Sequence, residues 1–178
     1  MISIDNIILG GGCFWCTEAI FKKINGVTSV FPGYIGGETT NPSYKEICTG
    51  LTGHAEVIRV EYDSQIISLK DILMIFFSTH DPTTFNRQGN DIGTQYRSSI
   101  FTSNTSERKI INDYIIELNQ SKIYLNLIVT TVEKETMFYL AENYHHDYFE
   151  QNKNVPYCSM IIAPKVKKLI ESKNSFLK

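Results

Sequence analysis

Three consecutive glycines end an apolar segment and lead directly into a cysteine. This junction constrains the fold more than any other feature of the chain. Residues 4–9 have the isoleucines and leucine of a buried strand, and the glycines at 10–12 allow a tight turn after it. From Phe14 onward, apolar side chains recur at helical spacing. The sequence therefore predicts a strand, a glycine turn and a helix, with Cys13 in the first helical turn.

A cysteine at this place is a candidate nucleophile. The start of a helix presents unpaired backbone N–H groups and the positive end of the helix dipole, and both favour a thiolate. The ordinary interpretation is a structural cysteine, because free cysteines are among the most buried residues. The glycine run and a second thiol three residues later, Cys16, favour the reactive interpretation.

Composition excludes several classes of protein. A chain of 178 residues with 42% hydrophobic residues suits one domain spanning 1–178, with a core of useful size. A net charge of −2 offers no basic surface for nucleic acid, and apolar runs such as 72–77 are too short to cross a bilayer. We see no signal-peptide pattern and expect a cytoplasmic protein. Four cysteines in that setting indicate redox or metal chemistry.

Hydrophobic periodicity predicts strands and helices that alternate without regular βαβ spacing. The predicted strands are 27–35, 55–62, 96–102 and 125–132, and the predicted helices begin after Ser68, after Asn104 and at Ala163, the last running to Leu177. Residues 80–95 form a long polar stretch of the kind that carries function, and 151–157 reads as an irregular, mobile segment. This pattern indicates an α+β protein, a two-layer sandwich on a mixed or antiparallel sheet.

Three interpretations of the Cys13 and Cys16 pair compete. A thioredoxin-like dithiol also has Cys-x-x-Cys at a helix start, but here the bulky Phe14 and Trp15 lie between the two cysteines. A structural zinc site in a non-catalytic binding module needs a second close pair of ligands, and Cys48 and Cys158 are isolated. The third interpretation is a single redox nucleophile, Cys13, with other thiols as helpers.

Several separated motifs cover nearly the whole chain. They are Gly12-Cys13-Phe14-Trp15, Gly33-Tyr34-Ile35-Gly36-Gly37, Asn41-Pro42-Ser43-Tyr44, Thr52-Gly53-His54-Ala55-Glu56-Val57, His80-Asp81-Pro82, the stretch from Arg87 to Ser98, Pro156-Tyr157-Cys158 and Ile162-Ala163-Pro164-Lys165. With these motifs the chain resembles the A-type peptide-methionine sulfoxide reductases. The resemblance implies a ferredoxin-like α/β sandwich. It also implies an enzyme that reduces the S epimer of methionine sulfoxide, free or in proteins, and so repairs oxidative damage without a metal or organic cofactor.

The resemblance also implies the roles of individual residues. These are Cys13 as the nucleophile, Glu56 as the acid, Tyr44 and Tyr96 as donors to the sulfoxide oxygen, Phe14 and Trp15 as the methyl pocket, and Asp91 as a substrate-binding group. Each role has a physical basis, because a glutamate among aromatic rings keeps its proton and phenols stabilise charge on oxygen. On a half-exposed strand, Glu56 would otherwise read as a surface residue. The four histidines read as structural or substrate-adjacent.

Recycling needs a second thiol, because attack by Cys13 leaves a sulfenic acid that condenses with a thiol. We favour Cys158, on the mobile segment, over Cys16, whose side chain need not face Cys13 if both lie in one helix. Cys48 reads as a packing residue. The resemblance implies thioredoxin as the external reductant, and we expect a monomer. A thioredoxin-like thiol–disulfide exchanger using Cys13 and Cys16 is the alternative function.

Overall fold

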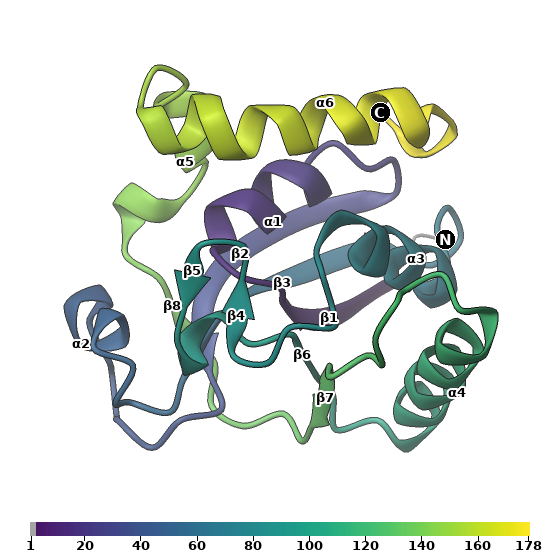
Figure 1. Cartoon of the computed structure of the whole chain (residues 1–178), viewed down its shortest axis with the longest axis horizontal. Helices are drawn as coiled ribbons and strands as arrows, with labels where there is room; N and C mark the ends of the chain where they lie inside the picture. Colours follow the sequence, from purple (N-terminus) through teal and green to yellow (C-terminus); the bar gives the residue numbers. More distant parts are fainter. Residues whose placement is uncertain (1–2) are drawn as a thin grey trace.

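The structure, a computed structural model, describes residues 3–178 and contains a six-stranded mixed sheet (Figure 1). The strand order is β7-β6-β1-β3-β2-β8. The strands are β1 (Ile4–Gly10), β2 (Val27–Ile35), β3 (Ala55–Asp63), β6 (Ser99–Phe101), β7 (Thr131–Glu133) and β8 (Tyr139–Leu140). The β6–β7 pair is parallel and the other neighbouring pairs are antiparallel. The predicted α+β class with a mixed sheet is confirmed.

Helices connect the strands and cover the sheet. They are α1 (Phe14–Phe21), α2 (Tyr44–Cys48), α3 (Leu69–Thr79), α4 (Thr105–Ser121), α5 (Tyr148–Gln151) and α6 (Ala163–Ser172). Shorter elements are the hairpin of β4 (Arg87–Gln88) and β5 (Asp91–Ile92), the 3₁₀ turns η1 (Thr94–Tyr96), η2 (Asn143–His145) and η4 (Asn174–Phe176), and the π-helical turn η3 (Cys158–Ile162). Helix α6 runs along the outside of α1 (Figure 1). Within residues 3–178, no helix combines the length and hydrophobicity that crossing a membrane requires.

Side-chain alternation along the strands separates two apolar clusters. Ile7 and Leu9 of β1, with Ile58 and Val60 of β3, belong to the main core under the helices. The intervening Ile8 belongs to a smaller cluster on the other face, which Phe138 covers. Strand β3 is therefore buried on both faces over much of its length.

The position of Glu56 follows from this alternation. Glu56 has the same parity along β3 as Ile58 and Val60, so its side chain lies on the face of the main core. The carboxylate is 1% exposed. The expectation that Glu56, apart from the resemblance, would be a surface residue is wrong because both faces of this strand are covered.

The predicted strand at 125–132 is largely absent. Leu125 and Leu127 are exposed, and regular pairing is confined to β7. Backbone groups in this stretch bond elsewhere: the Ile128 N–H donates to the Asn119 side chain, and the Val129 N–H donates to the Pro82 carbonyl. These bonds replace the sheet ladder, so the apolar alternation produces no strand there.

The C-terminal region is more helical than predicted. Residues 156–172 form one continuous helical run that includes η3 and α6. Cys158 is fully buried within this run. Residues 152–155, in the segment expected to be irregular, lie outside any helix, and the mobility of that segment stays a prediction. The final helix ends at Ser172, and a 3₁₀ turn follows in place of the predicted continuation to Leu177. The predicted strand at 96–102 is shortened to β6 by the 3₁₀ turn before it.

Candidate active site

Cys13 lies at the junction between β1 and α1, where close packing requires glycines. Gly12 has φ +87°, and a Cβ there would lie 2.6 Å from the Gln88 side chain. Cys13 itself is the N-cap of α1, with φ −57° and ψ 125°, so it precedes the first helical turn. Its side chain is 7% exposed. The glycine turn therefore places the Cys13 thiol between the end of β1 and the β4 strand.

The Cys16 thiol lies close to that of Cys13, and both line one cavity. The extended backbone at Cys13 removes the condition on which we disfavoured Cys16, namely that both residues lie in one helix. Burial raises the pKa of Cys13, which outweighs the helix start, while the interaction with the Cys13 thiol lowers the pKa of Cys16 to about 7. The first ionisation therefore belongs to the pair. Among residues 3–178, no three His, Cys, Asp or Glu side chains are arranged to hold a metal ion.

The Glu56 carboxyl lies beside the start of α1. Its Oε2 accepts a hydrogen bond from the Phe14 N–H at 3.3 Å, one residue after Cys13. Its Oε1 is buried and has no hydrogen-bond partner among the described residues. Burial raises the pKa of Glu56 to about 8, so the carboxyl is largely protonated at neutral pH. The arrangement is a neutral buried acid next to a thiol pair.

Two tyrosines lie near this acid. Tyr44 begins α2 and Tyr96 ends η1, and both side chains are half-buried. Burial is the main cause that raises the pKa of both phenols, and the nearby Glu56 is the second. Both phenols therefore keep their protons and remain hydrogen-bond donors. Tyr44 also contacts the thiol of Cys48. Cys48 is exposed, which corrects the prediction that it packs in the core.

Trp15 and Phe14 form an aromatic cluster with His145. The Phe14 ring is fully buried and lies 5.0 Å from the His145 ring, centroid to centroid. The Trp15 indole N–H donates to His145 Nδ1 at 3.0 Å. Tyr148 stacks on the indole at 3.7 Å with an interplanar angle of 6°. The half-buried Trp15 is therefore held on its edge and on one face.

Glu142 links this cluster to Tyr44. Its carboxylate accepts hydrogen bonds from the Tyr34 hydroxyl and from the Tyr44 backbone N–H, each at 2.7 Å. His145 Nε2 lies 3.6 Å from the same carboxylate. Burial lowers the pKa of His145 to about 4, so its ring is neutral and its Nδ1 can accept a hydrogen bond from the indole N–H.

A cavity of about 430 Å³ opens onto Cys13 from another direction. Its lining includes Cys16, Asp91, Tyr157 and Met160. The Tyr157 hydroxyl donates to Asp91 Oδ2 at 2.7 Å and lies 3.8 Å from the Cys16 sulfur. Phe14 and Trp15 do not line this cavity. Two groups of predicted site residues therefore lie near Cys13. Contacts of the Phe14 backbone and of aromatic rings connect Glu56, Tyr44, Phe14 and Trp15. Asp91 and Cys16 line the cavity.

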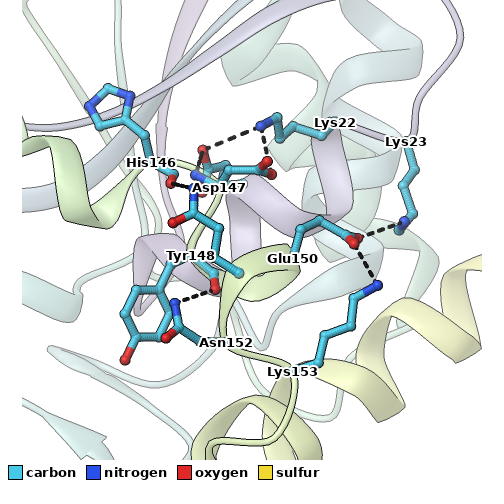
Figure 2. A network of polar contacts seen from close by, with 10 residues as sticks. Lys22, Lys23, His146, Asp147, Tyr148, Glu150, Asn152 and Lys153 are labelled. Carbon is cyan, nitrogen blue, oxygen red and sulfur yellow. Dashed lines mark hydrogen bonds and ion pairs between the residues drawn. The ribbon is translucent and has the colours of Figure 1, made fainter.

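Helix α1 is also attached to the segment that carries Tyr148. Buried Glu18 accepts the backbone N–H of Asp147 at 2.9 Å. Asp147 has φ +58°, and it pairs with Lys22 at 2.8 Å. Nearby, Glu150 pairs with Lys23 and with Lys153, as Figure 2 shows for this group of ion pairs. These bonds hold α5 against α1.

Sequence reasoning missed residues that support the site from the C-terminal region. They are Glu142, Tyr148 and Tyr157, while His145 agrees with the expectation that the histidines are structural or substrate-adjacent. Tyr157 precedes Cys158 inside a quoted motif, which is the one available signal. The others occur where the sequence predicts no regular element, so periodicity gave no indication of the side-chain directions.

Comparison with known proteins agrees with this geometry. A family model described as peptide methionine sulfoxide reductase matches residues 5–176. MsrA of Saccharolobus solfataricus is 53% identical over 92% of this chain and 91% of its own length. MsrA of Polynucleobacter asymbioticus is 49% identical over 93% of this chain and 87% of its own length.

Solved structures are similar as well. Reduced Mxr1 from Saccharomyces cerevisiae has a TM-score of 0.81 and 37% identity over 87% of this chain and 89% of that one. Mxr1 in complex with Trx2 has a TM-score of 0.58 and 26% identity over 82% and 84% of the two chains. The sequence, the fold and the thiol–glutamate arrangement lead to one conclusion: this chain belongs to the A-type peptide methionine sulfoxide reductases, the enzymes that reduce methionine S-sulfoxide to methionine.

Proposed function

We propose that Cys13 and Glu56 carry out the chemical step. The Cys13 thiolate attacks the sulfoxide sulfur while Glu56 gives its proton to the sulfoxide oxygen. The attack joins the two sulfur atoms. That bond and the sulfur–oxygen bond then break as the protonated oxygen moves, as a hydroxyl group, to the Cys13 sulfur, so methionine is released and Cys13 becomes a sulfenic acid. The observation that carries the proposal is the buried Glu56 carboxyl, which accepts a hydrogen bond from the N–H of Phe14 next to Cys13. Burial raises its pKa, and this favours the proton-donating form.

Tyr44 and Tyr96 donate hydrogen bonds to the oxygen as charge develops on it. Their raised pKa values support this role, because both phenols keep their protons. Trp15 and the buried Phe14 form the pocket for the S-methyl group, with Trp15 as its wall. Asp91, held by Tyr157, binds the substrate backbone from the cavity side.

Two thiols resolve the sulfenic acid in succession. Cys16 reacts first, forming a disulfide with Cys13 and releasing water, because the two thiols line the same cavity and Cys158 does not line it. Cys158 lies close enough to Cys16 for the Cys16 charge to raise its pKa. Its thiolate can attack the Cys16 sulfur, which forms a Cys16–Cys158 disulfide, breaks the Cys13–Cys16 bond and releases the Cys13 thiolate. Burial of Cys158 requires η3 to open for that second step. Our preference for Cys158 as the first thiol depended on its being carried by a mobile segment, and Cys158 itself lies buried in a helical turn.

The remaining assignments follow the family. Thioredoxin reduces the final disulfide, which the Mxr1–Trx2 complex supports. Both free and protein-bound methionine sulfoxide are substrates, no metal or organic cofactor takes part, and the enzyme acts as a cytoplasmic monomer with one domain over 1–178. The order β6-β1-β3-β2, joined by α1 and α3 as β-α-β-β-α-β, supports a ferredoxin-like core.

A single-turnover experiment without added reductant tests the proposal. Reduced enzyme is mixed with one equivalent of the S or the R epimer of N-acetyl methionine sulfoxide, and product and disulfides are measured by mass spectrometry. We expect about one methionine per enzyme from the S epimer, none from the R epimer, and none from Cys13→Ser. The first disulfide should join Cys13 and Cys16.

A Cys158→Ser variant separates the two resolving thiols. It should form the Cys13–Cys16 disulfide at the wild-type rate. A first disulfide between Cys13 and Cys158 in the wild type would contradict our order of events. Enzyme that reduces disulfides but leaves both sulfoxide epimers intact would support the thiol–disulfide exchanger instead.

A further inference from the structure

A second cavity lies directly beside the one that opens onto Cys13. Its volume is about 540 Å³, compared with about 430 Å³ for the cavity at Cys13. Gln88 and Lys165 line both cavities, so the two form one continuous depression. A volume of this size is typical of a ligand-binding cleft. The single methionine side chain that the reaction requires has no need of this space.

One face of α6 forms a wall of the second cavity. Lys165, Lys168, Leu169 and Ser172 recur at the three- and four-residue spacing of a helix face. Neither lysine forms an ion pair with any of residues 3–178 within 4.0 Å. The ion pair of this helix, Lys167 with Glu171, lies away from the cavity.

The rest of the lining suits a polypeptide. Ile123 and Leu125 line the cavity and are 70% and 104% exposed, so large apolar surface faces solvent here. Thr79, Asp81 and Asn126 add hydrogen-bonding groups. Asp81 is the acidic group among these, and the two lysines outnumber it. The lining therefore offers apolar surface, hydrogen-bonding groups and a positive balance of charge.

We propose that the second cavity binds the chain that flanks an oxidised methionine in a protein substrate. The methionine sulfoxide lies at Cys13, and the chain passes Gln88 and Lys165 to reach the second cavity. Acidic side chains of the substrate pair with Lys165 and Lys168, and an apolar side chain packs on Ile123 and Leu125. The inference rests on the proposed roles of Cys13 and Asp91, since those roles place the substrate backbone in the adjoining cavity.

Three substrates and two variants of α6 test this site, with dithiothreitol as the reductant. The substrates are N-acetyl methionine S-sulfoxide and two methionine sulfoxide peptides, flanked on both sides by glutamates or by lysines. For Lys168→Glu we expect kcat/KM for the glutamate peptide to fall about 3–10-fold and that for the lysine peptide to rise. The N-acetyl amino acid should be reduced at the wild-type rate.

Lys167→Glu is the matched control, because it makes the same charge change one residue away, at a position that does not line the cavity. It should leave the ratio between the two peptides unchanged. Equal effects of the two variants, or an equal fall for all three substrates, would overturn the site. An effect of Lys168→Glu that appears only with thioredoxin would also overturn it, because the surface would then bind the reductant. Failure of the wild type to reduce N-acetyl methionine S-sulfoxide would instead reject the proposed function.

Discussion

The junction of β1 and α1 and the C-terminal region after Ala141 build the same site in different ways. Cys13, Cys16 and Glu56 are almost fully buried and are attached to sheet and helix backbone. The C-terminal region approaches through short turns and is held by side-chain contacts, among them the exposed ion pairs of Glu150 (Figure 2). Exposed ion pairs contribute little stability. The reacting groups are therefore fixed by the core, while His145 and Tyr148, the side chains that hold Trp15, belong to the part of the molecule that can adjust.

Trp15 of α1 contacts His145 and Tyr148 of the C-terminal region, so its replacement should disturb the contact between the two regions most. In Trp15→Ala the substrate loses the methyl wall, and His145 and Tyr148 lose their shared partner. We expect kcat/KM for N-acetyl methionine S-sulfoxide to fall about 10–200-fold. Alkylation of Cys13 by iodoacetamide should proceed at the wild-type rate. Trp15→Phe keeps a wall without the indole N–H and should lose less activity.

Equal losses in reduction and in alkylation would contradict the role of Trp15 as a wall. The indole would then act on the ionisation of the thiol pair. The two regions would in that case be coupled through charge as well as through packing.

A smaller effect is expected from the bond that holds α5 on α1. Glu18→Ala leaves the buried N–H of Asp147 without an acceptor, which loosens Tyr148 from Trp15. We expect KM for the S-sulfoxide to rise about 3–10-fold with kcat nearly unchanged. Since Trp15 is the only tryptophan in the chain, its fluorescence reports the loss of stacking directly.

Two further variants complete that comparison. Glu18→Gln keeps an oxygen acceptor and should restore most of the affinity. Glu150→Gln removes the surface ion pairs of Lys23 and Lys153 and should change neither KM nor the fluorescence. A fall in kcat with unchanged KM in Glu18→Ala would contradict this account. The Glu18–Asp147 bond would then act on the reacting groups at the junction of β1 and α1 and not on Trp15.

The sequence was most informative where one physical rule determined the outcome. The glycine turn before Cys13, the caps at Ser68 and Asn104, and the long strands at 27–35 and 55–62 all follow from local patterns. The six-stranded order could not be derived, because the parallel β6–β7 pair depends on contacts far apart in the chain.

At the site, alternation already placed Glu56 on the same face of β3 as Ile58 and Val60. Burial of the Glu56 side chain could have been inferred from these apolar neighbours. The relation of Cys13 to Cys16 could not be inferred. It depends on whether Cys13 is helical, and one backbone angle at the N-cap decides that. His145 and Tyr148 were out of reach for a similar reason, because their directions are set by turns and by the left-handed Asp147.

The pH dependence of the single-turnover rate tests the proton-donating role of Glu56 most directly. Ionisation of the thiol pair should make the rate rise through about pH 7, and loss of the Glu56 proton should make it fall above about pH 8. Glu56→Gln should slow reduction roughly 10²–10⁴-fold at neutral pH and remove the fall above pH 8. Glu61→Gln, on the same strand, should keep the wild-type profile. A wild-type rate that keeps rising to pH 10, or the same fall in Glu56→Gln, would contradict the assignment of Glu56 as the acid.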